Sequence, residues 1–236
     1  MTSLLLFGFL IGMRHALEAD HVAAVATLST HSTTINQAIK LGFIWGFGHT
    51  ITLFLFGSMV LLTDLFLPES MANWLEFVVG IMLILLGLDV LRRLFQNRIH
   101  YHVHEHRNQI TQRQERHFHA HSHGNQQQQN PSHKHQHLDN LSWRALFIGI
   151  LHGLAGSAAL ILLTLETIQS PLQGILYIAL FGFGSIIGMT ALSCIITIPL
   201  RASATGMTWM HNGLQIVIGS STLVLGGIVI LENTPY

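Results

Sequence analysis

The stretch "GMRHALEADHVAAV", residues 12–25, concentrates ionisable side chains in an otherwise apolar part of the chain. Within eight positions it carries Arg14, His15, Glu18, Asp20 and His21. On both sides the sequence is an almost unbroken series of Leu, Phe, Ile, Val, Ala and Gly. Five polar groups in an apolar segment need a chemical explanation. That explanation depends on whether the segment lies in a protein core or in a lipid bilayer.

The composition indicates an integral membrane protein. The 236 residues are 50% hydrophobic and only 9% charged, with a mean hydropathy of +0.47. Soluble domains typically carry about 25% charged residues, so this chain has too few to cover a soluble surface. The formal net charge is zero, which gives no reason to expect nucleic acid as a partner. We expect the chain to lie in a lipid bilayer, with its first apolar stretch retained as a helix rather than cleaved as a signal peptide.

Six stretches are long and apolar enough to cross a bilayer, which requires about 20 residues per helix. We predict an all-α polytopic membrane protein with transmembrane helices at roughly 4–29, 40–63, 74–95, 142–167, 173–200 and 210–232. Residues 96–141 are rich in His, Gln, Asn and Arg and include "QQQQN" at 126–130, which predicts a disordered loop.

The distribution of lysine and arginine predicts the orientation of these helices. Apart from Arg14, every Lys and Arg lies near the loops after the first, third and fifth predicted helices. These three loops share one side, which the positive-inside rule makes cytoplasmic. We therefore expect a multi-pass protein of the cytoplasmic (inner) membrane, with both termini outside and the long loop in the cytoplasm.

An internal repeat relates the two halves of the chain. "GMRHALEADH" aligns with "GILHGLAGSA", which places His15 over His152. "WGFGHT" aligns with "FGFGSI", placing His49 over Ser185, and "LEFVVGIMLILLG" aligns with "LQIVIGSSTLVLG". The offsets are 137, 136 and 139. Three helices per repeat is an odd number, so the second repeat enters the membrane from the opposite side, as in many secondary transporters. The predicted organisation is two inverted three-helix repeats, 1–95 and 142–236, joined by the loop 96–141.

The polar cluster has the composition of a transition-metal site. A charge at the bilayer centre costs about 2.5–3.5 kcal/mol on insertion scales, so these side chains must face the helix bundle rather than lipid. On a continuous helix His15, Glu18 and His21 share one face, and only a break would bring Asp20 to it. Imidazole with carboxylate suits nickel, cobalt, zinc or copper, whereas calcium and magnesium prefer oxygen. His49, in "GFGHT" on the second predicted helix, is a third candidate ligand, and His152 from the second repeat is a fourth. For any one of these histidines, a hydrogen-bonded packing role stays an alternative.

Two other charged residues have a simpler interpretation. Arg14 is expected to pair with Glu18 or Asp20 and so lower their burial cost. Asp89 lies three and four residues before Arg92 and Arg93 at a predicted helix end, which favours an interfacial ion pair over a metal ligand.

At these motifs the chain resembles the nickel/cobalt transporter family. That family carries an H-x4-D-H signature on an early helix, commonly as "RHAxDADH"; "RHALEADH" at 14–21 fits it, with Glu18 in place of an aspartate. "GFGHT" at 46–50 resembles the family's Gly-His-Ser/Thr motif, and "HGLAGSAAL" at 152–160 resembles the shorter branch of urease-accessory and hydrogenase-accessory permeases. The aspartate motifs found in the second half of the larger permeases are not visible. The resemblance implies that His15, Asp20 and His21 are essential to transport and that His49 is important.

Eleven of the 17 histidines lie in the long loop, in the alternating runs "HYHVHEH", "HFHAHSH" and "HKHQH". In a flexible chain they predict weak, exchangeable binding of metal, which the loop would buffer, sense, or hand to a cytoplasmic metallochaperone of a nickel enzyme. A tolerated low-complexity linker is the alternative. The auxiliary ligands are His100, His102, His104, His106, His117, His119, His121, His123, His133, His135 and His137.

The leading functional hypothesis is a secondary transporter that takes up Ni²⁺, or Co²⁺, at a midplane site. An exporter that uses the loop as a collector, and a metal sensor without transport, are the alternatives. An enzyme is not expected, because the HExxH sequence of zinc proteases is absent and Cys194 is the sole cysteine. No cofactor is predicted, and the metal ion is cargo.

Overall fold

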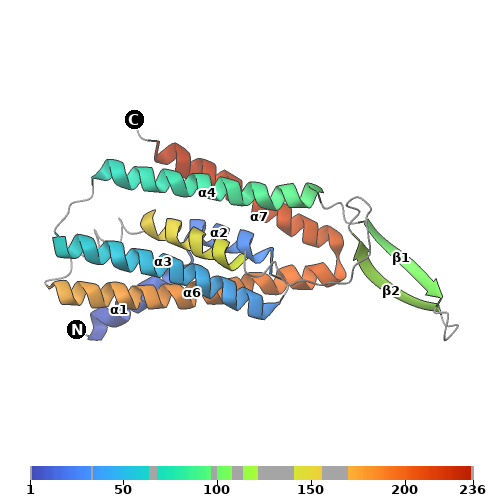
Figure 1. Cartoon of the computed structure of the whole chain (residues 1–236), viewed down its shortest axis with the longest axis horizontal. Coiled ribbons are helices and arrows are strands. Elements are labelled where there is room, and N and C mark those ends of the chain that lie inside the picture. Colours follow the sequence, from blue (N-terminus) through green and yellow to red (C-terminus); the bar gives the residue numbers. More distant parts are fainter. Residues whose placement is uncertain are drawn as a thin grey trace.

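The computed structural model describes residues 2–32, 34–63, 68–96, 100–107, 114–121, 141–155 and 170–234. In this part of the chain, long helices pack along one another and a two-stranded hairpin extends from one end (Figure 1). The elements in chain order are α1 (Thr2–His15), α2 (Ala19–Ser29), α3 (Ile35–Thr63), α4 (Glu69–Gln96), β1 (His100–Arg107), β2 (Gln114–His121), the helix Leu141–Ala155, α6 (Pro171–Gly206) and α7 (Thr208–Glu232).

Four helices, α3, α4, α6 and α7, are long and apolar enough to cross a membrane. Large apolar side chains are exposed along them, as expected for surfaces that face lipid; they include Leu55, Leu85, Ile195 and Leu231. The predicted helical membrane protein is thus confirmed as a class, and four of its six helices are confirmed as long apolar helices. The fourth predicted helix is described as Leu141–Ala155, and residues 156–167 lie outside the described part of the chain.

The first predicted helix, 4–29, is wrong as a continuous element, because the chain breaks inside the polar motif. The amides of Leu17 and Glu18 donate to the carbonyls of Arg14 and His15, three residues back, at 2.8 and 3.0 Å. Glu18 then adopts an extended backbone, with φ −64° and ψ 149°, before α2 begins. This tight turn ends α1 at His15 and lets α2 start in a new direction.

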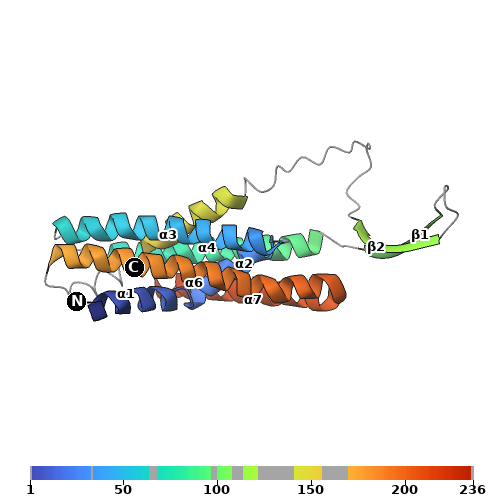
Figure 2. The ribbon, with the colours of Figure 1, turned by 90° about the horizontal axis from the view of Figure 1, so that it is seen from below.

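Glycines allow two helix pairs to come into backbone contact. A Cβ built on Gly226 of α7 would lie 2.8 Å from the carbonyl oxygen of Gly80 in α4, and one on Gly87 would lie 2.7 Å from that of Gly219. Rising residue numbers in α4 thus meet falling numbers in α7, so the pair is antiparallel. α3 and α6 also lie side by side along their lengths in both views (Figure 1 and Figure 2).

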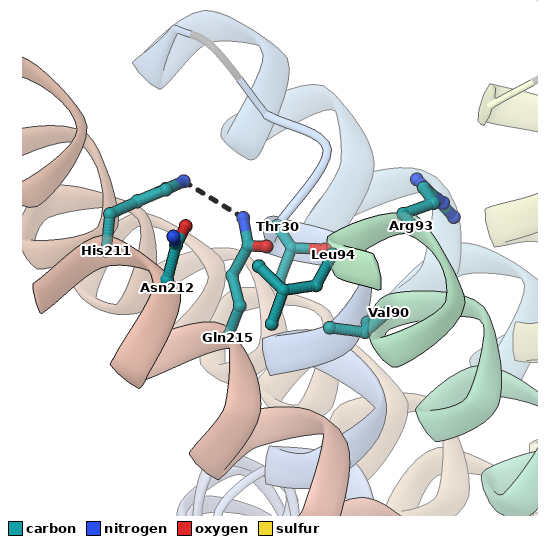
Figure 3. Close-up of a pocket in the computed structure, with 7 residues that line it drawn as sticks. All are labelled: Thr30, Val90, Arg93, Leu94, His211, Asn212 and Gln215. Carbon is teal, nitrogen blue, oxygen red and sulfur yellow. Dashed lines mark hydrogen bonds between the residues drawn. The ribbon is translucent and has the colours of Figure 1, made fainter. Parts of the chain in front are cut away.

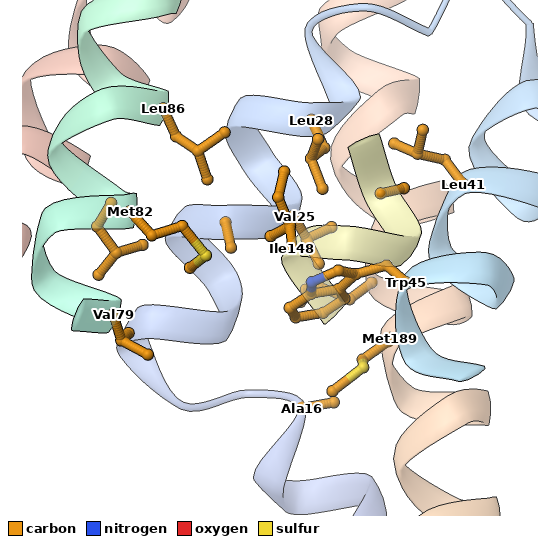
Figure 4. Close-up of a cluster of buried hydrophobic side chains, with 14 of the residues drawn as sticks. Ala16, Val25, Leu28, Leu41, Trp45, Val79, Met82, Leu86, Ile148 and Met189 are labelled. Carbon is orange, nitrogen blue, oxygen red and sulfur yellow. The ribbon is translucent and has the colours of Figure 1, made fainter. Parts of the chain in front are cut away.

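The core surrounds the short helix α2 rather than one of the long helices. Val25 and Leu28 of α2 pack in one buried cluster with Leu86 of α4, Trp45 of α3 and Ile148 of the helix Leu141–Ala155 (Figure 4). This cluster holds α2 between elements from both halves of the chain. It therefore fixes the position of the motif residues at the start of α2.

Charged groups cluster at the end of the bundle that carries the hairpin. Asp89 accepts hydrogen bonds from the guanidinium of Arg93, one turn later in α4, which confirms the predicted ion pair. Arg144, at the start of the helix Leu141–Ala155, reaches the same carboxylate at 3.2 Å. His31, just after α2, contacts Arg93 through Nδ1. Burial, reinforced by Arg93, lowers the pKa of His31 from its ordinary 6.5 to about 4.

Part of the predicted disordered loop is a paired hairpin. β1 and β2 are antiparallel, and their register pairs His100 with His121, His102 with His119 and His104 with His117. The two-residue alternation that the sequence shows in these runs is the period of a strand, which accounts for the difference from the prediction. His123, His133, His135 and His137 lie outside the described residues.

The glycine contacts give a stability prediction with a neighbouring control. Gly226→Ala places a methyl group against Gly80 and Ile84, and overpacking of this kind costs about 1–3 kcal/mol. At Gly227 a Cβ would meet nothing within 4 Å, so Gly227→Ala should keep or raise stability, because alanine is the better helix former. Thermal unfolding of the detergent-purified protein measures both; equal midpoints would contradict the close α4–α7 contact.

The lowered pKa of His31 predicts a loss of stability on acidification. Between about pH 6.5 and 4 the unfolded chain protonates this imidazole while the folded chain does not, so the folded state loses free energy relative to the unfolded state as the pH falls. His31→Asn should flatten this part of the dependence of the unfolding midpoint on pH. A curve identical to wild type would show that His31 titrates normally in the fold.

Candidate metal centre

The break between α1 and α2 positions the motif residues. His15 is the last residue of α1, Glu18 precedes α2, and Asp20 and His21 lie in its first turn. Asp20 accepts the backbone amide of His21 at 2.9 Å, and its charge is favourable at a helix N-terminus. The break thus brings Asp20 round to the histidines, which a continuous helix would not do.

Two further histidines arrive from other helices. His49 lies in the middle of α3, and His152 in the helix Leu141–Ala155. The ring centroid of His21 lies 4.3 Å from that of His15, 5.1 Å from that of His49 and 4.2 Å from that of His152. His21, His49 and His152 are essentially inaccessible to solvent. Four imidazoles from three separate parts of the chain therefore share one buried space.

The possible ligand atoms form two groups that share His21. One nitrogen from each of His15, His21 and His49 lies within 4.8 Å of the others, and Asp20, His21 and His152 form the second group by the same measure. Two nitrogens that each bind one ion at about 2 Å lie at most about 4 Å apart, so small side-chain rotations would close either group around a metal.

The two carboxylates face the rear nitrogens of the histidines. Glu18 Oε2 lies 3.0 Å from His15 Nδ1, and Asp20 Oδ1 lies 3.0 Å from His21 Nδ1. Because a carboxylate accepts a hydrogen bond from N–H, each neutral ring then presents a lone pair at Nε2. Among the described residues neither Nε2 has a hydrogen-bond partner, and neither has either ring nitrogen of His49. This carboxylate–histidine arrangement is the one that orients and strengthens metal-binding histidines.

Asp20 also joins the two halves of the chain. Its second oxygen lies 2.7 Å from His152 Nε2, so one carboxylate binds imidazoles of α2 and of the helix Leu141–Ala155. The predicted pairing of Arg14 with Glu18 or Asp20 is wrong: Glu18 contacts His15, Asp20 contacts His21 and His152, and Arg14 is exposed.

Sequence reasoning missed two aromatic residues at this centre. Trp45, one turn before His49, is fully buried with its ring 5.5 Å from His21 and 5.7 Å from His152. Phe181 of α6 is buried with its ring 5.2 Å from His15. An aromatic residue in an apolar helix gives no signal of its own in the sequence.

A comparison with known protein families identifies the family to which the chain belongs. Residues 1–232 match the NicO family, described as high-affinity nickel-transport protein. The chain belongs to the NicO family. The resemblance predicted from the motifs is thereby confirmed. As a member of a nickel-transport family, the protein is a transporter of the membrane rather than an enzyme.

Curated relatives agree with this assignment. The urease accessory protein UreH of Bacillus sp. (strain TB-90) is 34% identical over 226 residues, which cover 96% of this chain and 90% of that protein. The chloroplast protein FOR GROWTH AND FERTILITY 1 of Arabidopsis thaliana is 37% identical over 82 residues, 34% of this chain and 22% of that protein. No solved structure matches the chain.

The carboxylate contacts predict a graded effect on nickel transport by this NicO member. Asp20→Asn should lower the initial rate about 10–100-fold, because the amide no longer orients both His21 and His152. Glu18→Gln should have a smaller effect, since the Glu18 side chain is 57% exposed and, among the described residues, pairs with His15 alone. Nickel flux into proteoliposomes measures both, with Leu17→Ala, an exposed neighbour in the same break, as the control. Equal loss in all three variants would mean that the break, not the carboxylates, matters.

Proposed function

We propose that this protein is a secondary transporter that takes up Ni²⁺, or Co²⁺, and binds the ion inside the bilayer at His15, His21 and His49. The observation that carries the proposal is the convergence of four buried imidazoles whose free nitrogens have no protein partner in the described structure. Neutral imidazole suits nickel and cobalt, and the carboxylates of Glu18 and Asp20 offset the charge of a divalent ion in a medium of low polarity.

The two ligand groups suggest how the ion moves. His15, His21 and His49 would receive it, and Asp20, His21 and His152 would take it next, with His21 common to both groups. For the second step the hydrogen bond between Asp20 and His152 must break, so that Asp20 can bind the metal. A shared ligand keeps the ion coordinated throughout, which avoids a bare divalent charge in the bilayer.

The inverted-repeat architecture remains part of the proposal, and reciprocal contacts support it. Under the repeat alignment Gly80 corresponds to Gly219, and Gly87 to Gly226. Gly80 contacts Gly226, and Gly87 contacts Gly219, so each contact is the two-fold mate of the other.

The middle helices of the two repeats, α3 and α6, show the same reciprocity. The alignment pairs Gly46 with Gly182 and Thr50 with Ile186. A Cβ built on Gly46 would contact Ile186, and one built on Gly182 would contact Thr50. A pseudo-two-fold axis in the membrane plane has this effect on contacts, and in transporters of this type the substrate site lies at the interface of the repeats.

The lysine and arginine residues near the loops after the first, third and fifth predicted helices support the proposed orientation, with the histidine-rich loop in the cytoplasm. Inward movement of a divalent ion across 100 mV then gains about 4.6 kcal/mol, which permits uptake without ATP. The loop histidines would collect the released ion or transfer it to a metallochaperone. The same loop is the observation that favours the second candidate, efflux, in which it would collect cytoplasmic metal.

Accumulation of radioactive nickel in cells tests the site and the direction together. Compared with empty vector, wild type should accumulate nickel, His21→Ala should not, and a variant lacking residues 100–137 should keep most of the uptake. Leu17→Ala, an exposed residue in the break between α1 and α2, is the matched control.

Two results would contradict the proposal. Accumulation below the empty-vector level in wild type alone would mean efflux. Nickel binding by purified wild type, without flux into proteoliposomes, would mean a sensor.

A further inference from the structure

A second polar site lies at the end of the bundle that carries the hairpin. A pocket of about 200 Å³ opens between the C-terminal part of α4 and the first turns of α7 (Figure 3). Its polar lining comes from Thr30 after α2, from Arg93 of α4, and from His211, Asn212 and Gln215 of α7. At about 30 Å³ per water, the pocket has room for a metal ion together with several of its waters.

The hydrogen bonds of His211 determine which ring nitrogen carries the proton. The hydroxyl of Ser203 donates its single proton to the carbonyl of Leu200 at 2.8 Å. Toward His211 Nδ1, 3.1 Å away, the same hydroxyl must therefore accept, and Nδ1 carries the hydrogen. The neutral ring then presents its lone pair at Nε2, to which the amide of Gln215 donates at 2.9 Å.

This arrangement repeats the chemistry of the main centre at weaker strength. A hydrogen bond at the rear nitrogen fixes the ring and its tautomer, as the carboxylates do for His15 and His21. A half-turn of the Gln215 amide replaces its N–H groups by oxygen, and Asn212 offers a second neutral oxygen beside it (Figure 3). One imidazole and two amide oxygens bind a divalent transition-metal ion weakly, which suits rapid release.

The one cation in the pocket lining is turned away from these donors. Arg93 donates to both oxygens of Asp89, which offsets its charge. In Figure 3 its guanidinium lies on the far side of Leu94 from His211 and Asn212.

The short helix α2 connects this pocket to the histidine centre. His21 lies in its first turn, and Thr30, which lines the pocket, is its C-cap, nine residues or about 14 Å further along the helix axis. Buried hydroxyls lie along the way: Ser29 of α2 is 3.4 Å from Ser193 of α6. Thr197, one turn further along α6, is fully buried with no partner for its hydroxyl among the described residues.

We propose that His211, Asn212 and Gln215 form a release site, at which the transported Ni²⁺ pauses between the histidine centre and the side that carries the loop. The inference rests on the proposed nickel transport and extends it to a second position along α2. The hydroxyls of Ser29, Ser193 and Thr197 line the route between the two positions.

Anomalous diffraction at the nickel edge, on crystals of the full chain grown with Ni²⁺, tests the site directly. We expect one peak among His15, His21 and His49 and another at His211 Nε2, the latter lost in His211→Ala. Over a series of nickel concentrations, Asn212→Asp should raise the affinity of the pocket about tenfold and Asn212→Leu should lower it, with the main peak unchanged in both. Effects of opposite sign from one position separate a ligand from a packing residue.

The outcomes distinguish the two proposals. A main peak without one at His211 in wild type overturns the release site and leaves the proposed function intact; absence of both peaks overturns both. As a functional arm, His211→Ala should lower the maximal rate of nickel flux in proteoliposomes about tenfold. Wild-type flux in that variant would show that the pocket is not on the route, even if it binds metal.

Discussion

The contact of one carboxylate with two imidazoles is the constraint on which the centre depends. Asp20 binds His21 of its own helix and His152 of the other half of the chain, at 3.0 and 2.7 Å. In an interior of low polarity, a carboxylate without partners is costly, so neither imidazole can be removed without penalty. The break before α2 exists in a chain that otherwise favours continuous helices, and it is what brings Asp20 between the two rings.

Much of the centre was predictable from the sequence, because polar groups in an apolar chain stand out. Burial cost and ligand chemistry identified His15, His21 and His49, and the internal repeat added His152. The division of roles was not predictable: a helical wheel assumes one helix, and Ala16, Leu17 and Glu18 are all good helix formers that hide the break. In the structure the carboxylates of Glu18 and Asp20 face the Nδ1 atoms of His15 and His21, a placement that the helical wheel did not predict.

The fold was predictable where hydrophobicity is periodic or continuous and unpredictable where packing decides. α3, α4, α6 and α7 follow from their length and composition. The backbone contacts at Gly80 and Gly226 depend on which helices become neighbours, which a single sequence does not state. The hairpin β1–β2 was hidden by composition, because its histidines and glutamines are typical of disordered segments even though they alternate like a strand.

The bridge from Asp20 to His152 also has a consequence for biosynthesis. The two residues are 132 positions apart, so at 5–20 residues per second the ribosome delivers the second partner on the order of ten seconds after the first. Until then the carboxylate of Asp20 lacks one of its two imidazole partners. A nascent chain stopped before the helix Leu141–Ala155 would keep that group without its second partner, so the N-terminal half alone cannot satisfy its own buried carboxylate.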